Sequence, residues 1–431
     1  MRNINLHKGA RHRLAGVGCC FFPCRESNIK SNFYSLATSR LCLASLRLCV
    51  DAAPRSNQRC IQKGLPRRLG GLRIGERPGR AALDETVKNE PMTRCKVAVV
   101  GATGAVGKEI LNLLATRRFP ATEVVALASA RSTNSVVMYG DTMLPVRDLA
   151  EYEFKGTDIC LSAPGASVSK EFAPRAAAAG CIVIDKSSQF RMEPDVPLVV
   201  PEVNPHDLKW HSKRNIISSP NCTTIQMVVA LKPLHDLGTI RRIVISSYQA
   251  VSGAGKEAMI ELDQQARAHC AEATPQCEVF AKQIAFNLIP QIEDFSYEDY
   301  TKEELKLTHE THRILDPQIK VSATCVRVPV FNCHGESVNV EFEESVSPEA
   351  ARAALSRAPG VAVVDNPTEG AYATPIECSG RDEVFVSRIR RDSSIGNGLN
   401  LWIVSDNLRK GAALNAVQIA ELLVRDYLQR T

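Results

Sequence analysis

The strongest constraint on the fold lies between residues 95 and 119, where a short strand pattern passes through three glycines into a helix pattern. The residues run CKVAVV, then GATGAVG, then KEILNLLATRRF. Gly101, Gly104 and Gly107 permit a tight turn and let backbone amides at a helix N-terminus approach a pyrophosphate. The pattern predicts the first strand and helix of a Rossmann-type nucleotide-binding unit. A glycine-rich turn without a ligand is the alternative that this motif leaves open.

The end of the second predicted strand, in EVVALASARS, indicates which dinucleotide is bound. NAD-binding folds of this type usually carry an acid about 20 residues beyond the glycines, where it binds the ribose 2′-hydroxyl. Ser129 stands there instead, 22 residues after Gly107, and Arg131 and Ser132 follow it. Because a cation and hydroxyls suit a 2′-phosphate, the sequence favours NADP over NAD. A solvated loop arginine is the alternative interpretation of Arg131.

Strand and helix patterns continue to alternate beyond this point. DICLSAPGASVSKEFAP predicts a strand, a turn and a helix, and CIVIDKSSQFR predicts a buried strand that ends in a polar loop. Such alternation is typical of a parallel sheet, which binds its ligands at the carboxyl ends of the strands. Ser187, Ser188 and Arg191 lie in such a loop. Arg191 is expected to hold either an anion or an acid of the fold itself.

The segment NIISSPNCTTIQMVVALKPL places a cysteine at the start of a helix. Ile216 and Ile217 end a predicted strand, and an apolar helix is expected from about Thr223 to Leu234. Cys222 therefore lies at the helix N-terminus, where the partial positive charge favours a thiolate. Asn221 and the first free amides are candidate donors to a developing oxyanion. A buried structural cysteine is the alternative.

The basic surplus of the chain belongs to its N-terminal segment. Residues 1–91 carry 17 of the 53 Lys and Arg residues and only 6 of the 47 Asp and Glu residues, which leaves 36 basic and 41 acidic residues for 92–431. Because the rest of the chain is mildly acidic, its charge does not predict nucleic-acid binding. No run of 18 uncharged apolar residues predicts a membrane span. The cysteines show no paired spacing typical of zinc, so no metal site is expected.

Residues 1–91 lack sustained periodicity and are rich in Arg, Ser, Gly and Leu. The composition favours a disordered extension that takes no part in catalysis. A mitochondrial or plastid transit peptide is the main alternative, because such peptides are rich in Arg and Ser and poor in acids. A separate functional domain is the third possibility. The choice decides whether the protein is cytoplasmic, as we expect, or belongs to an organelle.

Several motifs occur in a fixed order along the rest of the chain: GATGAVG, ASARS, PEVN, SSPNCTT, YQAVSGAG, EELK and RVPVFNCH. In these motifs and their order the chain resembles the bacterial-type aspartate-semialdehyde dehydrogenases. The resemblance extends from about Arg94 to Leu423, so it covers the whole region with globular patterning. Agreement of several ordered motifs over about 330 residues is far more specific than the glycine-rich turn alone.

The resemblance implies a role for each matching residue. The implied catalytic and substrate-binding residues are Cys222 as nucleophile, His334 as general acid/base, Gln249 near the thioester, Arg327 at the α-carboxylate, Glu303 at the α-amino group, and Arg191, Lys306 and Asn221 at the phosphate. The implied cofactor-binding residues are Thr103, Gly104, Ala105, Val106, Arg131 and Ser132 at the NADP phosphates, Ser252 and Gly253 under the nicotinamide, and Asn407 at the cofactor site.

The residue types fit these implied roles. Arg binds a carboxylate through two hydrogen bonds, and an acid suits an ammonium. Glu303 and Lys306 are three residues apart in a Glu/Lys/Leu-rich helix pattern and therefore share one face; a surface ion pair is the alternative. Arg327 and His334 flank a turn expected near 332–335, and His334 is expected at a loop tip, where catalytic residues are common.

The resemblance implies reduction of L-aspartyl 4-phosphate to L-aspartate 4-semialdehyde by NADPH through a cysteine thioester, in biosynthesis of lysine (through diaminopimelate), methionine, threonine and isoleucine. A thioester conserves the energy of aldehyde oxidation for transfer to phosphate in the opposite direction. One rival function is N-acetyl-glutamyl-phosphate reductase, whose substrate lacks the free amino group that Glu303 would bind. A catalytically inactive paralogue that binds nucleotide or a protein partner is the other.

We therefore expect an α/β protein with three parts. Residues 1–91 form the extension, and residues 92–221, completed by 405–431, form a doubly wound NADP-binding domain whose last helix begins at about Asp406. Residues 222–404 form an α+β catalytic and dimerisation domain with a mixed or antiparallel sheet. The resemblance implies a homodimer that acts on a small-molecule substrate and has no nucleic-acid or membrane partner.

Overall fold

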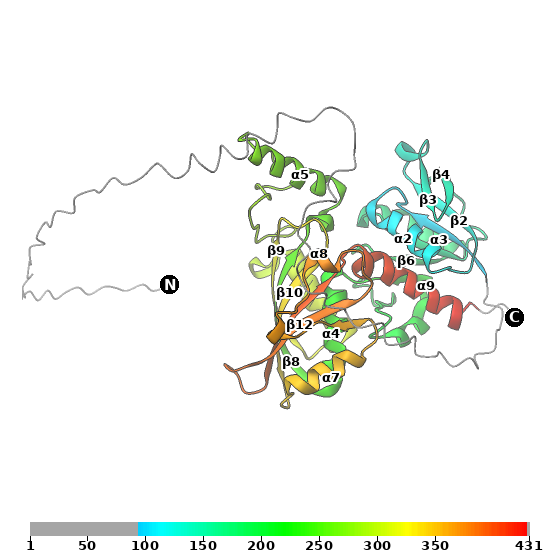
Figure 1. Cartoon of the computed structure of the whole chain (residues 1–431). Coiled ribbons are helices and arrows are strands. Elements are labelled where there is room, and N and C mark those ends of the chain that lie inside the picture. The colour runs from blue at the N-terminus through cyan, green and yellow to red at the C-terminus, as the bar shows by residue number, and fades with distance from the viewer. Residues whose placement is uncertain (1–93, 429–431) are drawn as a thin grey trace, which may run out of the picture. The chain divides into compact units, whose positions relative to one another are not determined.

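The computed structural model describes residues 94–428, and the predictions made for residues 1–91 lie outside this range. The described residues contain two β-sheets (Figure 1). The first sheet has seven strands in the order β3-β4-β2-β1-β5-β6-β7. All of its pairings are parallel except that of β3 with β4. The strands are β1 (Cys95–Val100), β2 (Ala121–Ala128), β3 (Val136–Tyr139), β4 (Thr142–Asp148), β5 (Ile159–Ser162), β6 (Ile182–Asp185) and β7 (Ile216–Ser218).

Helices cover both faces of the first sheet, which explains why its central strands are apolar at consecutive positions. Val97 and Val99 of β1 pack with α2 (Ala105–Thr116) and with α9 (Leu414–Asp426) near the C-terminus. Ala98 and Val100 face the opposite side, where they share a cluster with Phe172 of α3 (Ala166–Ala178). The last helix of the chain therefore completes the core that the first strand begins (Figure 1).

The second sheet has six strands in the order β11-β12-β13-β10-β8-β9. It is mixed: β10 pairs antiparallel with β8 and β13, whereas β8 and β9 are parallel. Its strands are β8 (Ile240–Gln249), β9 (Lys320–Arg327), β10 (His334–Phe342), β11 (Val361–Val363), β12 (Val384–Asp392) and β13 (Gly398–Ser405). The remaining helices are α4 (Cys222–Leu237), α5 (Lys256–Cys270), α6 (Lys302–Ile314), α7 (Pro348–Arg357) and α8 (Pro375–Cys378).

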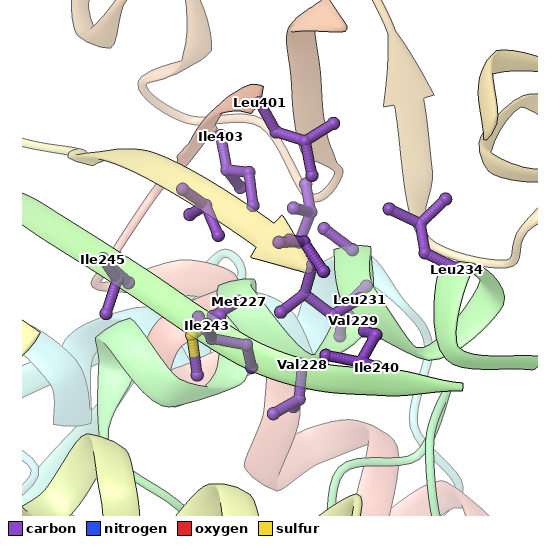
Figure 2. Packing of buried hydrophobic residues seen from close by; sticks show 14 of the residues in the cluster. Met227, Val228, Val229, Leu231, Leu234, Ile240, Ile243, Ile245, Leu401 and Ile403 are labelled. Atoms are coloured by element: carbon purple, nitrogen blue, oxygen red, sulfur yellow. The ribbon is translucent and has the colours of Figure 1, made fainter. Parts of the chain in front are cut away.

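Helix α4 joins the two sheets. It starts four residues after β7, the edge strand of the first sheet, and then packs along the inner face of the second sheet. Figure 2 shows side chains of α4, such as Met227 and Leu231, gathered with Ile243 and Ile245 of β8 and with Ile403 of β13. The N-terminus of α4 therefore lies at the junction of the two sheets.

The predicted fold class is confirmed: a nucleotide-binding sheet of doubly wound type is combined with an α+β part built on a mixed sheet.

Two local predictions are wrong. The last helix begins at Leu414, after a π-helical turn over Arg409–Ala413, and not at Asp406. His334 does not lie at a loop tip but is the first residue of β10, because the connection from β9 occupies 328–333. The domain boundaries at 91/92, 221/222 and 404/405 stay predictions.

None of the helices in residues 94–428 is long and apolar enough to cross a membrane.

Strand β10 carries an acid in the core beneath the second sheet. Glu336 is fully buried, and both carboxyl oxygens lack a hydrogen-bond partner among the described residues. Burial raises the pKa of Glu336 well above its ordinary value of 4.5, and only the Gln226 amide opposes this rise. The folded protein therefore holds a proton that the unfolded chain releases above pH 4.5, so this group makes folding less favourable as the pH rises through that range.

We predict that Glu336→Gln stabilises the protein at pH 8 by about 1–3 kcal/mol, the usual cost of a buried polar group left unsatisfied. The new amide has an acceptor nearby, since Gln226 Oε1 is also buried without a partner. Urea unfolding of both proteins at pH 8 and at pH 4.5 measures the difference, which should shrink at the lower pH. An equal difference at both pH values would contradict an ionisation effect.

Candidate active site

One pocket collects the residues on which the sequence analysis concentrated. It is lined by residues that follow β5, β6 and β7 at the carboxyl end of the first sheet, and by residues from β8, β9 and α6 of the second part. The predicted residues among its lining are Val106, Arg191, Asn221, Cys222, Gln249, Ser252, Gly253, Glu303, Lys306, Arg327 and Asn407. The structure therefore brings together residues that are up to about 300 positions apart in the chain.

Cys222 is the first residue of α4, and Asn221 is its N-cap. The Asn221 side chain accepts a hydrogen bond from the Thr223 amide at 2.9 Å, as Asn does at many helix starts. Its Nδ2 donates to Glu303 Oε1 at 3.0 Å, and its backbone N–H donates to Glu310 Oε2 at 2.7 Å. These bonds tie the start of α4 to α6 and fix the position from which the Cys222 thiol enters the pocket.

The electrostatics at Cys222 differ from the expectation of a lowered pKa. Burial raises the pKa of the Cys222 thiol to about 11, and Glu303 adds to this rise. Arg191, Arg327 and Lys186 act in the opposite direction, but their sum is smaller. The cause is desolvation: Cys222 keeps some exposed surface, but the protein around it disfavours the thiolate more than the nearby cations favour it. Position at a helix start therefore does not by itself produce a low pKa here.

Glu303 is buried at the centre of the pocket's polar contacts. Its carboxylate accepts hydrogen bonds from Gln249 Nε2 at 3.1 Å and from Lys306 Nζ at 3.1 Å, in addition to Asn221. Burial raises its pKa, but the Lys306 ammonium and these hydrogen bonds lower it below the ordinary value. Glu303 is therefore a carboxylate that faces the pocket, and the alternative of a surface ion pair is excluded by its burial.

Arg191 and Lys306 are both paired with acids of the protein. Arg191 Nη1 donates to Glu310 Oε1 at 3.0 Å, while its other nitrogens donate to the backbone oxygens of Ser219 and Lys186. Lys306 Nζ contacts Glu293 Oε1 at 2.5 Å besides Glu303. Both alternatives considered for Arg191, an anion or an acid of the fold, thus find support, because it holds Glu310 and also lines the pocket.

Arg327 lies at the end of β9 and donates from Nη1 to the backbone oxygen of Ala250 at 2.8 Å. Although the guanidinium is buried, no acid of the described residues forms an ion pair with it. Burial lowers its pKa, and Glu303 and Cys222 oppose this. Arginine nevertheless keeps its charge, so Arg327 offers a cation with free donors to an anionic ligand.

His334 is completely buried and does not itself line the pocket; its ring lies behind Gly253, which does. The Ala250 backbone N–H donates to Nδ1 at 3.0 Å, so in the neutral ring the proton resides on Nε2. Nε2 has no partner among the described residues. Burial and the Arg327 charge lower the pKa of His334 to about 3, which keeps the ring neutral at physiological pH. The site therefore contains one N–H donor that is free to bind a ligand oxygen.

Gly253 allows this arrangement, since it lines the pocket beside both His334 and Arg327. A Cβ atom at this position would lie 3.3 Å from His334 Nε2 and 2.9 Å from Arg327 Nη1. A side chain here would therefore crowd the two groups that face the ligand. The same holds at Gly411, where a Cβ atom would lie 2.8 Å from the Cys222 Cβ.

The predicted cofactor residues form two groups. Gly104 caps α2 without a side-chain hydrogen bond, so the first amides of this helix, at Ala105 and Val106, stay available to a phosphate. Gly107 must be glycine, because a Cβ atom would lie 2.1 Å from the Gly101 oxygen. Thr103 precedes the cap in the same turn. These features fit a dinucleotide pyrophosphate.

The remaining cofactor residues fit their expected places as well. Arg131 and Ser132 form a solvent-accessible 3-10 turn directly after β2, where a 2′-phosphate would lie. Ser252 is hydrogen-bonded to Asn407 at 3.0 Å, and Asn407 Oδ1 also accepts the Cys333 amide at 2.9 Å. Asn407 thereby links the C-terminal turn to the residue next to His334.

Sequence reasoning missed several residues of the pocket. Lys186, Gln291 and Glu293 line it without having been predicted. Glu310 braces Arg191 and Asn221 from behind, and its signal was present in the sequence: it lies seven residues, or two helical turns, after Glu303. Among the residues that the structure describes, no cluster of His, Cys, Asp and Glu is arranged to hold a metal ion.

The carboxylate of one residue of α5 positions another part of the pocket lining. Val279 and Phe280 line the pocket, and the Glu261 carboxylate accepts the backbone N–H groups of Glu278, Val279 and Phe280. Gln265, one turn later, holds the amides of 284 and 285. The sequence shows two polar residues on an amphipathic helix, and nothing in it indicates that they face inward.

Comparisons with known proteins agree with this geometry. The family profile described as "Semialdehyde dehydrogenase, NAD binding domain" matches residues 96–211, and the one described as "Semialdehyde dehydrogenase, dimerisation domain" matches residues 231–410. The aspartate-semialdehyde dehydrogenase of Aquifex aeolicus is 54% identical over 336 residues, which are 77% of this chain and 99% of that protein.

Two solved structures are similar in fold. The crystal structure of aspartate semialdehyde dehydrogenase II complexed with ASA from Vibrio cholerae has a TM-score of 0.77 at 45% identity and covers 78% of this chain and 100% of that one. The crystal structure of aspartate semialdehyde dehydrogenase with NADP from Candida albicans has a TM-score of 0.60 at 26% identity and covers 77% of this chain and 98% of that one.

We predict that alkylation of Cys222 by iodoacetamide accelerates about tenfold per pH unit from pH 7 towards its pKa of about 11, because the thiolate is the reacting species. Mass spectrometry of Cys222-containing peptides measures the rate, and Cys222→Ser is the control for peptide assignment. A rate that levels off below pH 8 would show that the thiol ionises far more easily than its burial implies.

Proposed function

The chain belongs to the family of aspartate-semialdehyde dehydrogenases, and from this premise we propose that it reduces L-aspartyl 4-phosphate to L-aspartate 4-semialdehyde with NADPH. The observation that carries the proposal is the pocket itself, in which a cysteine at a helix start is surrounded by one buried carboxylate and several cations. This is the complement of an amino acid that bears an acyl phosphate. The reaction belongs to the biosynthesis of lysine, methionine, threonine and isoleucine.

Substrate binding follows from the charges of the pocket. Arg327 has free donors for the α-carboxylate, and the Glu303 carboxylate suits the α-ammonium. Asn221, Arg191 and Lys306 lie together on the side of the phosphate, and Gln249, held by Glu303 at 3.1 Å, orients the acyl group. A substrate with an acetylated amine offers Glu303 no ammonium and leaves Lys306 as its ion-pair partner, so the pocket favours a free amine over N-acetyl-glutamyl phosphate.

Cys222 carries the covalent step. Its sulfur attacks the acyl carbon, a C–S bond forms, and the C–O bond to the phosphate breaks; the phosphate leaves with the electron pair and takes up the proton that the thiol loses. Arg191 and Arg327, the two cations that most oppose the raised pKa of Cys222, stabilise the sulfur anion during this attack. The result is a thioester on Cys222.

When bound, NADPH supplies the hydride that reduces the thioester carbon. The electron pair of the C=O π bond moves to the acyl oxygen, which becomes an alkoxide. His334 donates a hydrogen bond to this oxygen from Nε2, the buried donor that lacks a partner. When the C–S bond breaks, the carbonyl forms again and Cys222 leaves as the thiolate. In the opposite direction His334 stabilises the same alkoxide, formed by addition of Cys222 to the aldehyde. His334 therefore acts at the oxygen and stays neutral between turnovers.

We assign the NADP phosphates to the N-terminus of α2, from Thr103 to Val106, and to Arg131 and Ser132 after β2. Ser252 and Gly253 would lie under the nicotinamide, with Asn407 holding Ser252 in place. Support comes from the uncapped amides at α2 and from the absence of an acid at the end of β2. The Candida albicans relative was solved with NADP.

The assay that tests the function is phosphate-dependent formation of NADPH from aspartate semialdehyde. We predict activity with this aldehyde, little with N-acetyl-glutamate semialdehyde, and a loss of at least about a thousandfold in kcat for Cys222→Ala, because the nucleophile is removed. Glu303→Gln keeps the size of the side chain and one acceptor oxygen but removes the charge and the second acceptor, so it should raise KM for the aldehyde. Full activity of Cys222→Ala would exclude the covalent route, and preference for the acetylated aldehyde would favour the reductase.

We further propose a homodimer that uses the open face of the second sheet. Val244, Tyr248 and Ser337, at alternate positions of its strands, are exposed or half-exposed, and Trp402 beside them is partly buried against the cluster that contains Cys378 of α8. Tyr248 and Trp402 lie 5.8 Å apart on this face, next to the half-exposed Tyr372. A sheet face with clustered aromatics is typical of an interface core. The profile that matches 231–410 is that of a dimerisation domain.

We predict that Ser337→Arg, in the middle of this face, converts a dimer into monomers, because a twofold interface would bring two buried cations together. Size-exclusion chromatography with light scattering measures the mass. Ser212→Arg, the same change on an exposed position near the first sheet, should leave the dimer intact. A wild-type protein that is monomeric at micromolar concentration would contradict the proposed interface.

The domain boundaries and the location of the protein are also proposals. We place the NADP-binding domain at 92–221 together with 405–431, and the catalytic and dimerisation domain at 222–404. Packing of α9 on α2 and β1 supports the split first domain. We propose the cytoplasm as location, with an organelle as the alternative if residues 1–91 are a transit peptide. Mass spectrometry of the N-terminus of the native protein distinguishes the two.

A further inference from the structure

The cationic side chains of the pocket differ in the ion pairs and hydrogen bonds that they form with the rest of the protein. Arg191 is paired with Glu310 at 3.0 Å, and Lys306 with Glu293 at 2.5 Å and Glu303 at 3.1 Å. Arg327 at least donates to a backbone oxygen at 2.8 Å. Lys186 also lines this pocket, yet its ammonium forms no ion pair or hydrogen bond with another residue of the range 94–428.

The acid beside Lys186 in the sequence is occupied by other donors. Asp185 is completely buried and accepts hydrogen bonds from Ser162 at 2.8 Å, Ser169 at 2.6 Å and Ser187 at 2.6 Å. Three hydroxyl groups thus surround its two oxygens. Lys186 follows the end of β6, so its side chain enters the pocket at the carboxyl edge of the first sheet.

The surroundings of Lys186 make an unpaired ammonium costly. Burial and the nearby Arg191 charge lower the pKa of Lys186, while Cys222 and Asp185 oppose this. A half-buried cation beside a second cation is stabilised only when an anion joins them. Lys186, which lies close to Arg191 and Cys222, therefore suits an anionic ligand.

We propose that Lys186 binds the phosphate group of the substrate, and inorganic phosphate in the opposite direction, as its principal charge partner. The inference rests on the proposed function, which supplies a ligand with one carboxylate, one ammonium and one phosphate. Arg327 and Glu303 account for the first two. Because Arg191 and Lys306 are already balanced by acids of the protein, they position and hydrogen-bond the phosphate, and Lys186 supplies the uncompensated charge.

A different role would be to stabilise the Cys222 thiolate, since Lys186 favours ionisation of this thiol. The two roles have separate consequences. Loss of a phosphate ligand raises the KM for phosphate, whether or not alkylation of Cys222 also slows. Loss of a thiolate partner slows alkylation of Cys222 at a given pH and leaves the KM for phosphate unchanged.

The test uses the full chain and compares Lys186→Met with Lys186→Arg and with the control Lys170→Met, an exposed lysine on α3. In the oxidative direction, we expect Lys186→Met to raise the KM for inorganic phosphate about 10- to 100-fold, the range of a lost charge-assisted hydrogen bond. The KM values for aspartate semialdehyde and NADP should change less than about twofold. Lys186→Arg should retain phosphate binding to within a few fold, and Lys170→Met should match the wild type.

A second measurement does not depend on turnover. Inorganic phosphate should protect Cys222 of the wild type from iodoacetamide, and Lys186→Met should need at least about tenfold more phosphate for the same protection. An unchanged KM and an unchanged protecting concentration in Lys186→Met would overturn the proposal, as would slower alkylation in the absence of phosphate with no change in phosphate binding. If the wild type shows no phosphate-dependent NADPH formation, the proposed function fails, whereas the protection experiment still decides whether Lys186 binds phosphate.

Discussion

The geometry of the whole site depends on the hydrogen bonds of Asn221. Its backbone and side chain bind Glu310 and Glu303 of α6, while its Oδ1 caps α4 at the Thr223 amide. One residue thus fastens the end of the first sheet to α4 and α6. Arg191, which donates to Glu310, adds a second polar contact at the same junction.

The chemistry of the site arises from opposing electrostatic effects. Burial makes both the Cys222 thiolate and the His334 imidazolium unfavourable, and the two groups are therefore held in their neutral forms. A neutral imidazole whose Nδ1 already accepts the Ala250 amide keeps its proton on Nε2, which has no partner among the described residues. In the proposed mechanism, the cations around Cys222 favour the thiolate during the attack, and burial favours the thiol between turnovers.

Much of the site could be predicted from the sequence, because its residues follow strand ends and helix starts that local patterns mark. The glycine turn, the helix start at Cys222 and the shared face of Glu303 and Lys306 are of this kind. Features set by tertiary packing could not be predicted. No local pattern shows that desolvation raises the pKa of Cys222 more than the helix N-terminus lowers it. No local pattern shows that His334 begins a buried strand. The same holds for Glu261 of α5. Its carboxylate points inward because it binds the backbone of a loop segment, and no local pattern shows this contact.

The packing of Gly411 against Cys222 links the site to the order in which the chain is made. Asn407, Gly411 and Ala412 form part of the pocket wall, and α9 behind them completes the core around β1. These residues are synthesised after every other part of the site. Cys222 thus stays without this wall, and the first sheet without its covering helix, until residues 407–426 have been made. A chain that stops before Asn407 would carry Cys222 and His334 and still lack the wall that Gly411 forms.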